Sequence, residues 1–434
     1  MTDVWNAETV FGEGLDQAIQ RLYGNSPNVR ERQRRRYDRI GDQFRRRFEK
    51  EPVAFFSAPG RTEIIGNHTD HNGGEVLAAS ISLDVVAAAA PNQTWTVSLH
   101  SEGFPEPFVV DLRDLSPRAQ EKGTPALIRG VAAGFMERSY AVGGFDAYAS
   151  SDILNASGLS SSAAIEMLLG TILSGFYNGG AVDPYVLAKI GQSAENRYWN
   201  KQSGLLDQLA CGLGGLIHLD FRDRDEPKAQ NVNFDFGKEG YAFLIVNTGG
   251  NHAHLTDEYT KVPVEMRAVA NHFGKERCIE LTLEQVVAEI PRLRASAGDR
   301  AVLRVLHFFA ENERVRRQVA LLERNDSPGF LDLVTASGSS SWRLLQNGYD
   351  VSDTRSQGIP LALALTERFL ETRGVHGAYR VHGGGFAGVT LVILPEALVE
   401  EYSDLVTPVF GEGAVMSLTI REYGSVNVSA LAQF

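Results

Sequence analysis

The sequence has few cysteines and lacks long apolar runs, and each absence excludes a class of protein. Cys211 and Cys278 lie far apart, outside any CxxC pair or Cys/His cluster, so we expect neither a disulfide framework nor a structural zinc site. No segment approaches the roughly 18 apolar residues of a membrane span. The start, MTDVWNAETVFGEG, lacks the basic and apolar regions of a secretory signal. We therefore expect a cytoplasmic protein without a membrane partner.

Acidic residues outnumber basic residues in the sequence. The 42 Lys and Arg against 54 Asp and Glu leave a formal charge of -12, which argues against a nucleic-acid partner. The exception is residues 30–50, which carry nine arginines. Because Tyr37, Ile40, Phe44 and Phe48 recur at steps of three and four, they predict one apolar face of a helix. We interpret the segment as a helix with solvated arginines; the alternative is a nucleic-acid arm.

The length predicts more than one domain. At 434 residues, with 43% of them apolar, the chain exceeds what a single core usually holds. The first half is rich in predicted strands, followed by helices that begin near Ser160 and Asp183. The second half opens with a strand at 241–248 and then alternates long helices with late strands. We predict domains at 1–220 and 221–434, joined through the glycine- and charge-rich segment 215–230.

The segment NASGLSSSAAIE, residues 155–166, places glycine and hydroxyl residues before an apolar helical run. Unpaired N–H groups and the positive end of the helix dipole attract anions, and small residues let a phosphate approach the backbone. The alternative is an ordinary serine-rich helix cap. A Walker-type loop is excluded because GxxxxGK[ST] is absent from the sequence.

The segment GRTEIIGNHTDHNGG, residues 60–74, concentrates Arg61, His68, Asp70 and His71. In extended chain, His68 and Asp70 point to one side and His71 to the other, so three converging metal ligands are not easily built. Hydrogen bonding to a polyhydroxylated ligand fits better, and a polar turn is the alternative.

Two further segments are candidates for a site. SGLLDQLACGLGG isolates Asp207 among apolar and small residues, where a carboxylate needs a cation such as Arg61 unless it is a capping or surface residue. VHGGGFAGVTLVI, residues 381–393, is a glycine-rich turn that either passes close to a bound group or forms a flexible hairpin.

Taken together, five segments resemble those of galactokinases, a family of the GHMP kinase superfamily. They are APGRTEIIGNHTDHNGG, GLSSSAA, SGLLDQ, IVNTGGNHAHLTDEY and GGGFAG, in the family's order over residues 58 to 390. The resemblance implies an α+β fold of two domains, ribosomal-protein-S5-like and then ferredoxin-like, with the active site in the interdomain cleft. It also implies ATP-dependent phosphorylation of the anomeric hydroxyl of galactose, with Mg²⁺ as cofactor.

The resemblance further implies roles for particular residues. Asp207 would be the catalytic carboxylate, kept ionised by Arg61. Ser161 and Glu195 would hold Mg²⁺ through oxygen, which that ion prefers. The ATP phosphates would lie at Gly158, Leu159, Ser160, Ser161, Ser162 and Ala163. The sugar would contact Asn67, His68, Asp70, Gly204 and Tyr259.

Some residues depart from the family pattern. Asn67 stands where galactokinases carry a glutamate that contacts the hydroxymethyl end of the sugar, and His71, Glu63 and Ala156 replace tyrosine, asparagine and glycine. Alternatives therefore include a kinase for galacturonate or N-acetylgalactosamine, and a non-catalytic galactose sensor. We expect the adenine contacts near Trp95 to Phe108 and leave monomer or dimer open.

Overall fold

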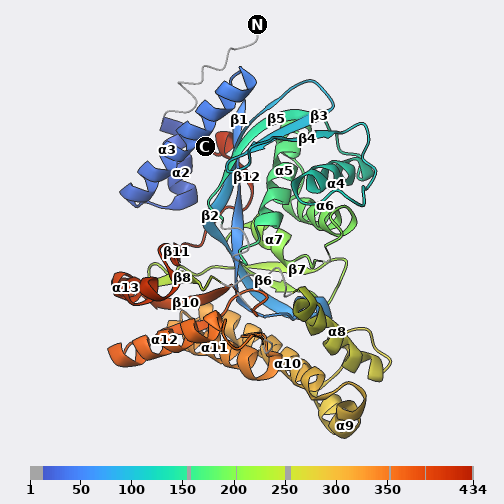
Figure 1. Cartoon of the computed structure of the whole chain (residues 1–434), viewed down its shortest axis with the longest axis vertical. Helices are drawn as coiled ribbons and strands as arrows, with labels where there is room; N and C mark the ends of the chain where they lie inside the picture. Colours follow the sequence, from blue (N-terminus) through green and yellow to red (C-terminus); the bar gives the residue numbers. More distant parts are fainter. Residues whose placement is uncertain are drawn as a thin grey trace.

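The computed structural model describes residues 13–153, 158–201, 203–249, 256–350, 353–386 and 388–432. These residues form two β-sheets with helices packed on their faces (Figure 1). The predicted starts of two helices are confirmed: α5 begins at Ser161, and the side chain of Asp183 caps α6 by accepting from Tyr185 N at 2.7 Å.

The first sheet has eight strands, with β12, β1, β2, β5, β3 and β4 in spatial order and β6 and β7 added beside β2. The strands are β1 (Ala54–Ile65), β2 (Glu75–Pro91), β3 (Thr96–Ser101), β4 (Phe108–Asp111), β5 (Phe145–Ser151), β6 (Leu216–Asp220), β7 (Lys228–Val232) and β12 (Val426–Asn427). β2 is apolar at nearly every position because both of its faces are covered.

Helices cover both faces of this sheet (Figure 1). They are α2 (Glu13–Tyr23), α3 (Pro27–Phe48), α4 (Thr124–Glu137), α5 (Ser161–Tyr177), α6 (Pro184–Arg197), α7 (Leu206–Leu213) and α14 (Val428–Leu431). Along β2, Val85 and Ala87 contribute to the large core shared with α4–α7, while Val86 and Ala88 pack with α2 and α3. The alternation of a strand thus divides one run of apolar residues between two cores.

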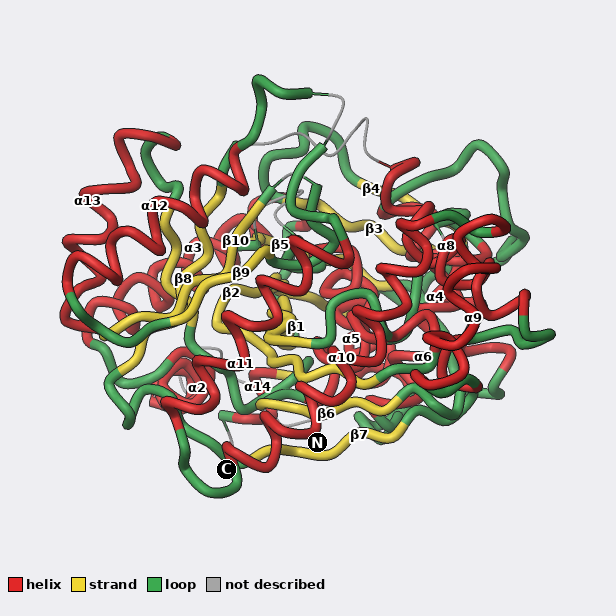
Figure 2. The backbone as a smooth tube through the Cα atoms, turned by 90° about the horizontal axis from the view of Figure 1, so that it is seen from below, coloured by secondary structure: helices red, strands yellow, loops and turns green. Residues whose placement is uncertain are grey.

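The second sheet has the order β11, β8, β10, β9 and is covered on both faces, as Figure 2 shows. Its strands are β8 (Tyr241–Asn247), β9 (Ala378–Val381), β10 (Val389–Pro395) and β11 (Val415–Leu418). The helices of this half are α8 (Thr256–His272), α9 (Leu283–Ser296), α10 (Asp299–Leu322), α11 (Ser327–Ser340), α12 (Gly358–Arg373) and α13 (Val399–Phe410). Short 3₁₀ helices lie at Asp70–Asn72, Cys278–Glu280 and Glu396–Leu398, and a π-helical segment, Ser341–Leu345, follows α11 directly.

The expected crossing at 215–230 is wrong. Residues of this segment form β6 and β7, a hairpin whose first strand pairs with β2 of the first sheet. The chain reaches the second sheet only after Val232, and after β11 it returns, so that β12 pairs with β1. The domain limits 1–220 and 221–434 stay a prediction, and the sheet pairing favours a later division.

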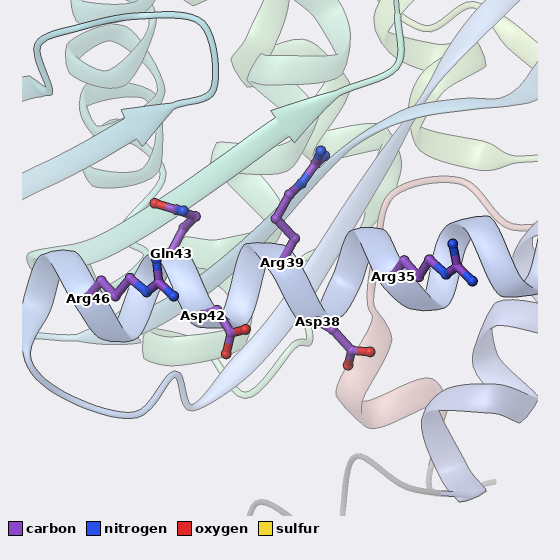
Figure 3. Close-up of a pocket in the computed structure, with 6 residues that line it drawn as sticks. All are labelled: Arg35, Asp38, Arg39, Asp42, Gln43 and Arg46. Carbon is purple, nitrogen blue, oxygen red and sulfur yellow. The ribbon is translucent and has the colours of Figure 1, made fainter.

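Helix α3 carries the arginine-rich segment, and its arginines pair with carboxylates. Arg45 contacts Asp42 at 2.8 Å and Glu51 at 2.7 Å, and Arg39 contacts Glu102 at 3.1 Å. Figure 3 shows the outer face of the helix, where Asp38 and Asp42 alternate with arginines along a shallow pocket. The interpretation as a solvated helix is confirmed, because the opposite face buries Tyr37, Ile40 and Phe44.

A buried carboxylate fixes α2 and α3 on the sheet. Asp84 of β2 accepts hydrogen bonds from Arg36 at 2.7 Å, Arg421 at 2.9 Å and Tyr23 at 2.6 Å, and also from Ser57. Burial works to raise the pKa of Asp84, but the charges of Arg36 and Arg421 outweigh it and the pKa is lowered. Segments distant in sequence therefore meet at one charge.

Helix α10 binds the segment between β1 and β2, which contains the predicted sugar-binding residues. Four polar residues of the helix form hydrogen bonds to both ends of this segment. The contacts are His307 Nε2 to Asn67 O at 3.0 Å, Gly66 N to Glu311 Oε1 at 3.1 Å, Glu75 N to Asn312 Oδ1 at 2.7 Å and Arg316 Nε to Glu75 Oε1 at 2.8 Å.

None of the helices among the described residues is long and apolar enough to cross a membrane.

We predict that Asp84→Ala lowers the free energy of unfolding by about 3–5 kcal/mol, because buried Arg421 loses its counter-charge and buried Arg36 keeps only Asp152, at 3.0 Å. Urea unfolding measures the loss. The exposed Asp38, which pairs with Arg34 at 3.6 Å, provides the matched control, and Asp38→Ala should change stability by about 0.5 kcal/mol or less. Equal effects of the two substitutions would refute the role of Asp84.

Glu311 should make stability fall in acid. Burial works to raise its pKa, but His307, Arg314 and Arg380 outweigh burial and lower the pKa to about 2. Since the folded pKa lies below the unfolded value of 4.5, the stabilisation is complete above pH 4.5 and is lost as the pH falls toward 2. Glu311→Gln should therefore flatten the dependence of unfolding free energy on pH between about 4.5 and 3. Urea titrations at several pH values test this, with exposed Glu313→Gln as control; parallel curves for wild type and Glu311→Gln would contradict it.

Candidate functional site

The predicted phosphate loop lies between β5 and α5. Gly158 and Ser160 adopt the left-handed conformation, with φ of 70° and 59°, before the helix begins at Ser161. The loop contacts β1, since Arg61 N donates to Leu159 O at 3.2 Å. Residues 154–157 lie outside the described residues. They include Ala156, where the sequence departs from the family pattern. The described part presents the N-terminus of an apolar helix, where an anion can meet backbone donors.

Arg61 and Asp207 form an ion pair at this loop. Arg61 Nε donates to Asp207 Oδ1 at 2.9 Å, its Nη2 lies 2.8 Å from the same oxygen, and its Nη1 donates to Gly158 O. Ser160 Oγ donates to Asp207 Oδ2 at 2.5 Å. Burial works to raise the pKa of Asp207, but Arg61 and the Ser160 hydroxyl outweigh it, so the pKa is lowered. The predicted pairing of Asp207 with Arg61 is confirmed, and Ser160 of the serine loop contacts the same carboxylate, whose side chain is 31% exposed.

A second polar group surrounds Glu195 of α6. Ser162 Oγ donates to Glu195 Oε1 at 2.8 Å, Lys201 Nζ lies 2.5 Å from the same oxygen, and Gln208 Nε2 donates to Oε2 at 3.2 Å. Gln208 also donates to buried Glu166 at 2.8 Å. Burial and the charge of Glu195 raise the pKa of Glu166 well above its usual value. The side chain of Gln208 thus connects the two carboxyl groups.

The serine that contacts Glu195 is Ser162, one residue after the predicted Ser161. Oxygen donors from Ser162 and Glu195 converge beside the phosphate loop, and such hard oxygens suit Mg²⁺. The described residues contain no group of three or more His, Cys, Asp or Glu that could hold a metal ion. A cation here would therefore take few protein ligands, as Mg²⁺ does when nucleotide phosphates supply the others.

The predicted sugar-binding residues meet beside the glycine-rich turn that follows β9. His68 Nε2 donates to Gly384 O at 3.0 Å, and burial lowers the pKa of His68 to about 4. The imidazole is then neutral, with Nδ1 left as an acceptor. Tyr259 OH donates to Gly385 O at 3.0 Å. Together, His68 and Tyr259 contact the turn from opposite halves of the chain.

Gly204 allows a close approach to Asp70. A Cβ atom at Gly204 would lie 2.5 Å from Asp70 Oδ2, so only glycine leaves room for this carboxylate. His71 lies beside the pair, with its Nε2 3.9 Å from Asp70 Oδ2. Most of the segment that precedes Tyr259, residues 250–255, lies outside the described residues, as does Ala387.

Asn67 has a different environment from that of His68. Its amide donates to Glu63 Oε1 at 2.8 Å and Gly383 O at 2.7 Å, and its oxygen accepts from Asn347 at 2.7 Å. Arg380 contacts Glu63 at 3.3 Å. Three of the four hydrogen bonds that an amide can make thus go to protein groups. A direct contact between Asn67 and a sugar stays a prediction, whereas its contacts to the turn are present.

Sequence reasoning missed three polar residues of this site. Lys201 and Asn347 stand outside the family motifs and reach the site only through folding. His382 directly precedes the glycine turn, and its Nε2 accepts from Glu63 N at 3.3 Å. This leaves the proton on buried Nδ1, for which no residue that the structure describes is a hydrogen-bond partner. A polar residue directly before three glycines is unusual, and this was the one signal in the sequence that could have indicated His382. Its position beside Gly158 could not be predicted from the sequence.

The predicted adenine region lies at the edge of the first sheet. Trp95 and Phe104 are about half exposed there, beside β3 and β4. Their contact with a nucleotide stays a prediction.

Comparison with known families gives two matches. The model described as galactokinase galactose-binding signature matches residues 42–91, which include the Arg61 strand and the segment with His68 and Asp70. The model for the GHMP kinases N terminal domain matches residues 126–215, which include the phosphate loop and Asp207.

Similar proteins cover most of the chain. A galactokinase of Streptomyces coelicolor is 31% identical over 88% of this chain and 95% of its own length. A galactokinase of Clostridium tetani is 28% identical over 81% of this chain and 86% of its own length.

Solved structures agree in fold. The crystal structure of Lactococcus lactis galactokinase complexed with galactose superposes with a TM-score of 0.77 at 25% identity, covering 90% of this chain and 99% of that one. Methanococcus jannaschii mevalonate kinase, at 14% identity and a TM-score of 0.60, covers 84% and 98% and shares the fold alone. The α+β GHMP kinase fold is confirmed, while the finer description of its two domains stays a prediction. With a relative above 30% identity spanning nearly its whole length, the chain belongs to the galactokinase family.

Proposed function

We propose that this protein transfers the γ-phosphoryl group of ATP to the anomeric C1 hydroxyl of galactose, releasing ADP and galactose 1-phosphate. The observation that carries the proposal is the Arg61–Asp207 pair, which lies where the phosphate loop meets the sugar-binding segment. A cytoplasmic location and the choice between monomer and dimer stay predictions.

The phosphate loop supplies the nucleotide side of the reaction. The backbone donors at the start of α5, which follow Gly158 and Ser160, would bind the ATP phosphates, because the helix end carries a partial positive charge. Phosphoryl transfer depends mainly on positioning and on neutralising charge. Arg61, bound to both Asp207 and the loop, is placed to offset the charge that develops on the transferred group.

Asp207 supplies the acceptor side. Its lowered pKa keeps it ionised, so it can accept a hydrogen bond from the C1 hydroxyl and orient the oxygen toward the γ-phosphorus. As the new O–P bond forms and the bond to the β-phosphate oxygen breaks, the hydroxyl proton passes to Asp207. A carboxylate of low pKa is a weak base, so orientation comes before proton transfer.

Mg²⁺ fits the oxygen pair of Ser162 and Glu195, in place of the Ser161 and Glu195 pair predicted from the sequence. These two residues would hold the ion, whose charge would offset part of that of the nucleotide phosphates.

The sugar side is formed by His68, Asp70, Gly204 and Tyr259. Asp70 can accept from two neighbouring hydroxyls, and His68 Nδ1 can accept from a third. Asn67 and Asn347 hold the sugar-binding segment against the glycine turn. A site built from hydrogen-bonding groups rejects a sugar that leaves one of them unpaired.

Asp207→Asn should lower kcat by about 10²–10⁴-fold with little change in ATP-analogue affinity, because the amide cannot take the proton. ADP release with galactose measures the rate, and exposed Asp223→Asn serves as control. A variant that turns over near the wild-type rate would remove Asp207 from catalysis. In the same assay, turnover of galacturonate or N-acetylgalactosamine but not galactose would reassign the substrate, and no ADP release with any sugar would favour a sensor.

Gly204→Ala should raise the KM for galactose by about tenfold or more, since the new methyl group displaces Asp70 from its position. The KM for ATP should change little. Gly41→Ala is a matched control, because its Cβ would meet Phe55 at an ordinary 3.4 Å. An unchanged KM for galactose would show that Asp70 does not bind the sugar.

A further inference from the structure

We propose that Lys201 holds the divalent-cation position closed until the nucleotide binds. Its ammonium occupies the oxygens of Ser162 and Glu195, and a divalent cation reaches them only when the lysine moves away. The inference rests on the proposed function, which assigns these two oxygens to Mg²⁺.

The contacts around Lys201 are those that a cation at this position would make. Lys201 Nζ lies 2.5 Å from Glu195 Oε1 and donates to Ser162 Oγ at 3.2 Å. Ser162 Oγ in turn donates to Glu195 Oε1 at 2.8 Å. The ammonium and the two oxygens are therefore in mutual contact, and a metal ion at the same oxygens would overlap the ammonium.

Charge explains why a cation is needed even without nucleotide. The side chain of Glu195 is only 2% exposed, and Lys201 is its one ion-pair partner among the described residues. A buried carboxylate without a counter-ion is costly. Gln208 contributes a hydrogen bond to Glu195 but no charge. Lys201 thus stabilises the empty site.

Lys201 is also able to leave. Its side chain is 51% exposed, on a flexible four-carbon stem. Two cations at one carboxylate oxygen repel each other, so the metal and the lysine exclude one another unless further negative charge arrives. A triphosphate supplies that charge. The Trp199 ring lies 5.2 Å from Nζ while the ammonium contacts Glu195, so this cation–π contact belongs to the closed position.

Mn²⁺ binding to the full chain, measured by the electron paramagnetic resonance of the free ion, tests the proposal. Without nucleotide, Lys201→Met should bind Mn²⁺ at least about tenfold more tightly than wild type, because the competing charge is gone. With a non-hydrolysable ATP analogue present, the difference should shrink to about threefold or less. Mn²⁺ should also raise the Tm of Lys201→Met more than that of wild type.

Three controls separate the possible failures. Lys201→Arg keeps the charge and should resemble wild type, as should Lys189→Met, which removes a lysine of α6 that pairs with Glu226 at 3.3 Å. Glu195→Gln in the Lys201→Met background should abolish the gain in affinity. Unchanged or weaker Mn²⁺ binding by Lys201→Met would overturn the inference alone. Loss of Glu195 without effect on Mn²⁺ binding would refute the metal position itself, and the inference with it.

Discussion

The pairing of Arg61 with Asp207 is the interaction on which the site depends. A carboxylate that must stay ionised inside a folded chain requires a cation of fixed position, and Arg61 is fixed by β1 on one side and by Gly158 of the phosphate loop on the other. The same guanidinium therefore sets the charge of Asp207 and the distance between the strand and the loop.

The two halves of the chain cooperate through α10. His307, Glu311 and Asn312 hold the backbone of the segment between β1 and β2 through hydrogen bonds. The glycine turn after β9 accepts hydrogen bonds from His68 and Tyr259. The first half carries Arg61 and Asp207, and residues of the second half hold the segment that contains Asn67 and His68.

The sequence predicted the parts of the fold that local chemistry controls. The start of α5 after a glycine-serine loop and the capping of α6 by Asp183 depend on neighbours in the chain, so their signals are visible in the sequence. The segment 215–230 was misassigned because its charged turn resembles a linker, although β6 and β7 pair on either side of it. Lys201, Asn347 and the choice of Ser162 over Ser161 depend on packing between distant segments, which one sequence does not display.

The return of the chain to its first sheet has a consequence for biosynthesis. Arg421 supplies one of the two cations that neutralise Asp84, and β12 pairs with β1. A ribosome completes the chain from residue 84 to residue 421 before that partner emerges, so until then Asp84 has Arg36 as its one buried cation among the described residues. During translation the first sheet also lacks β12, the strand that pairs with β1, until the C-terminal segment has been made.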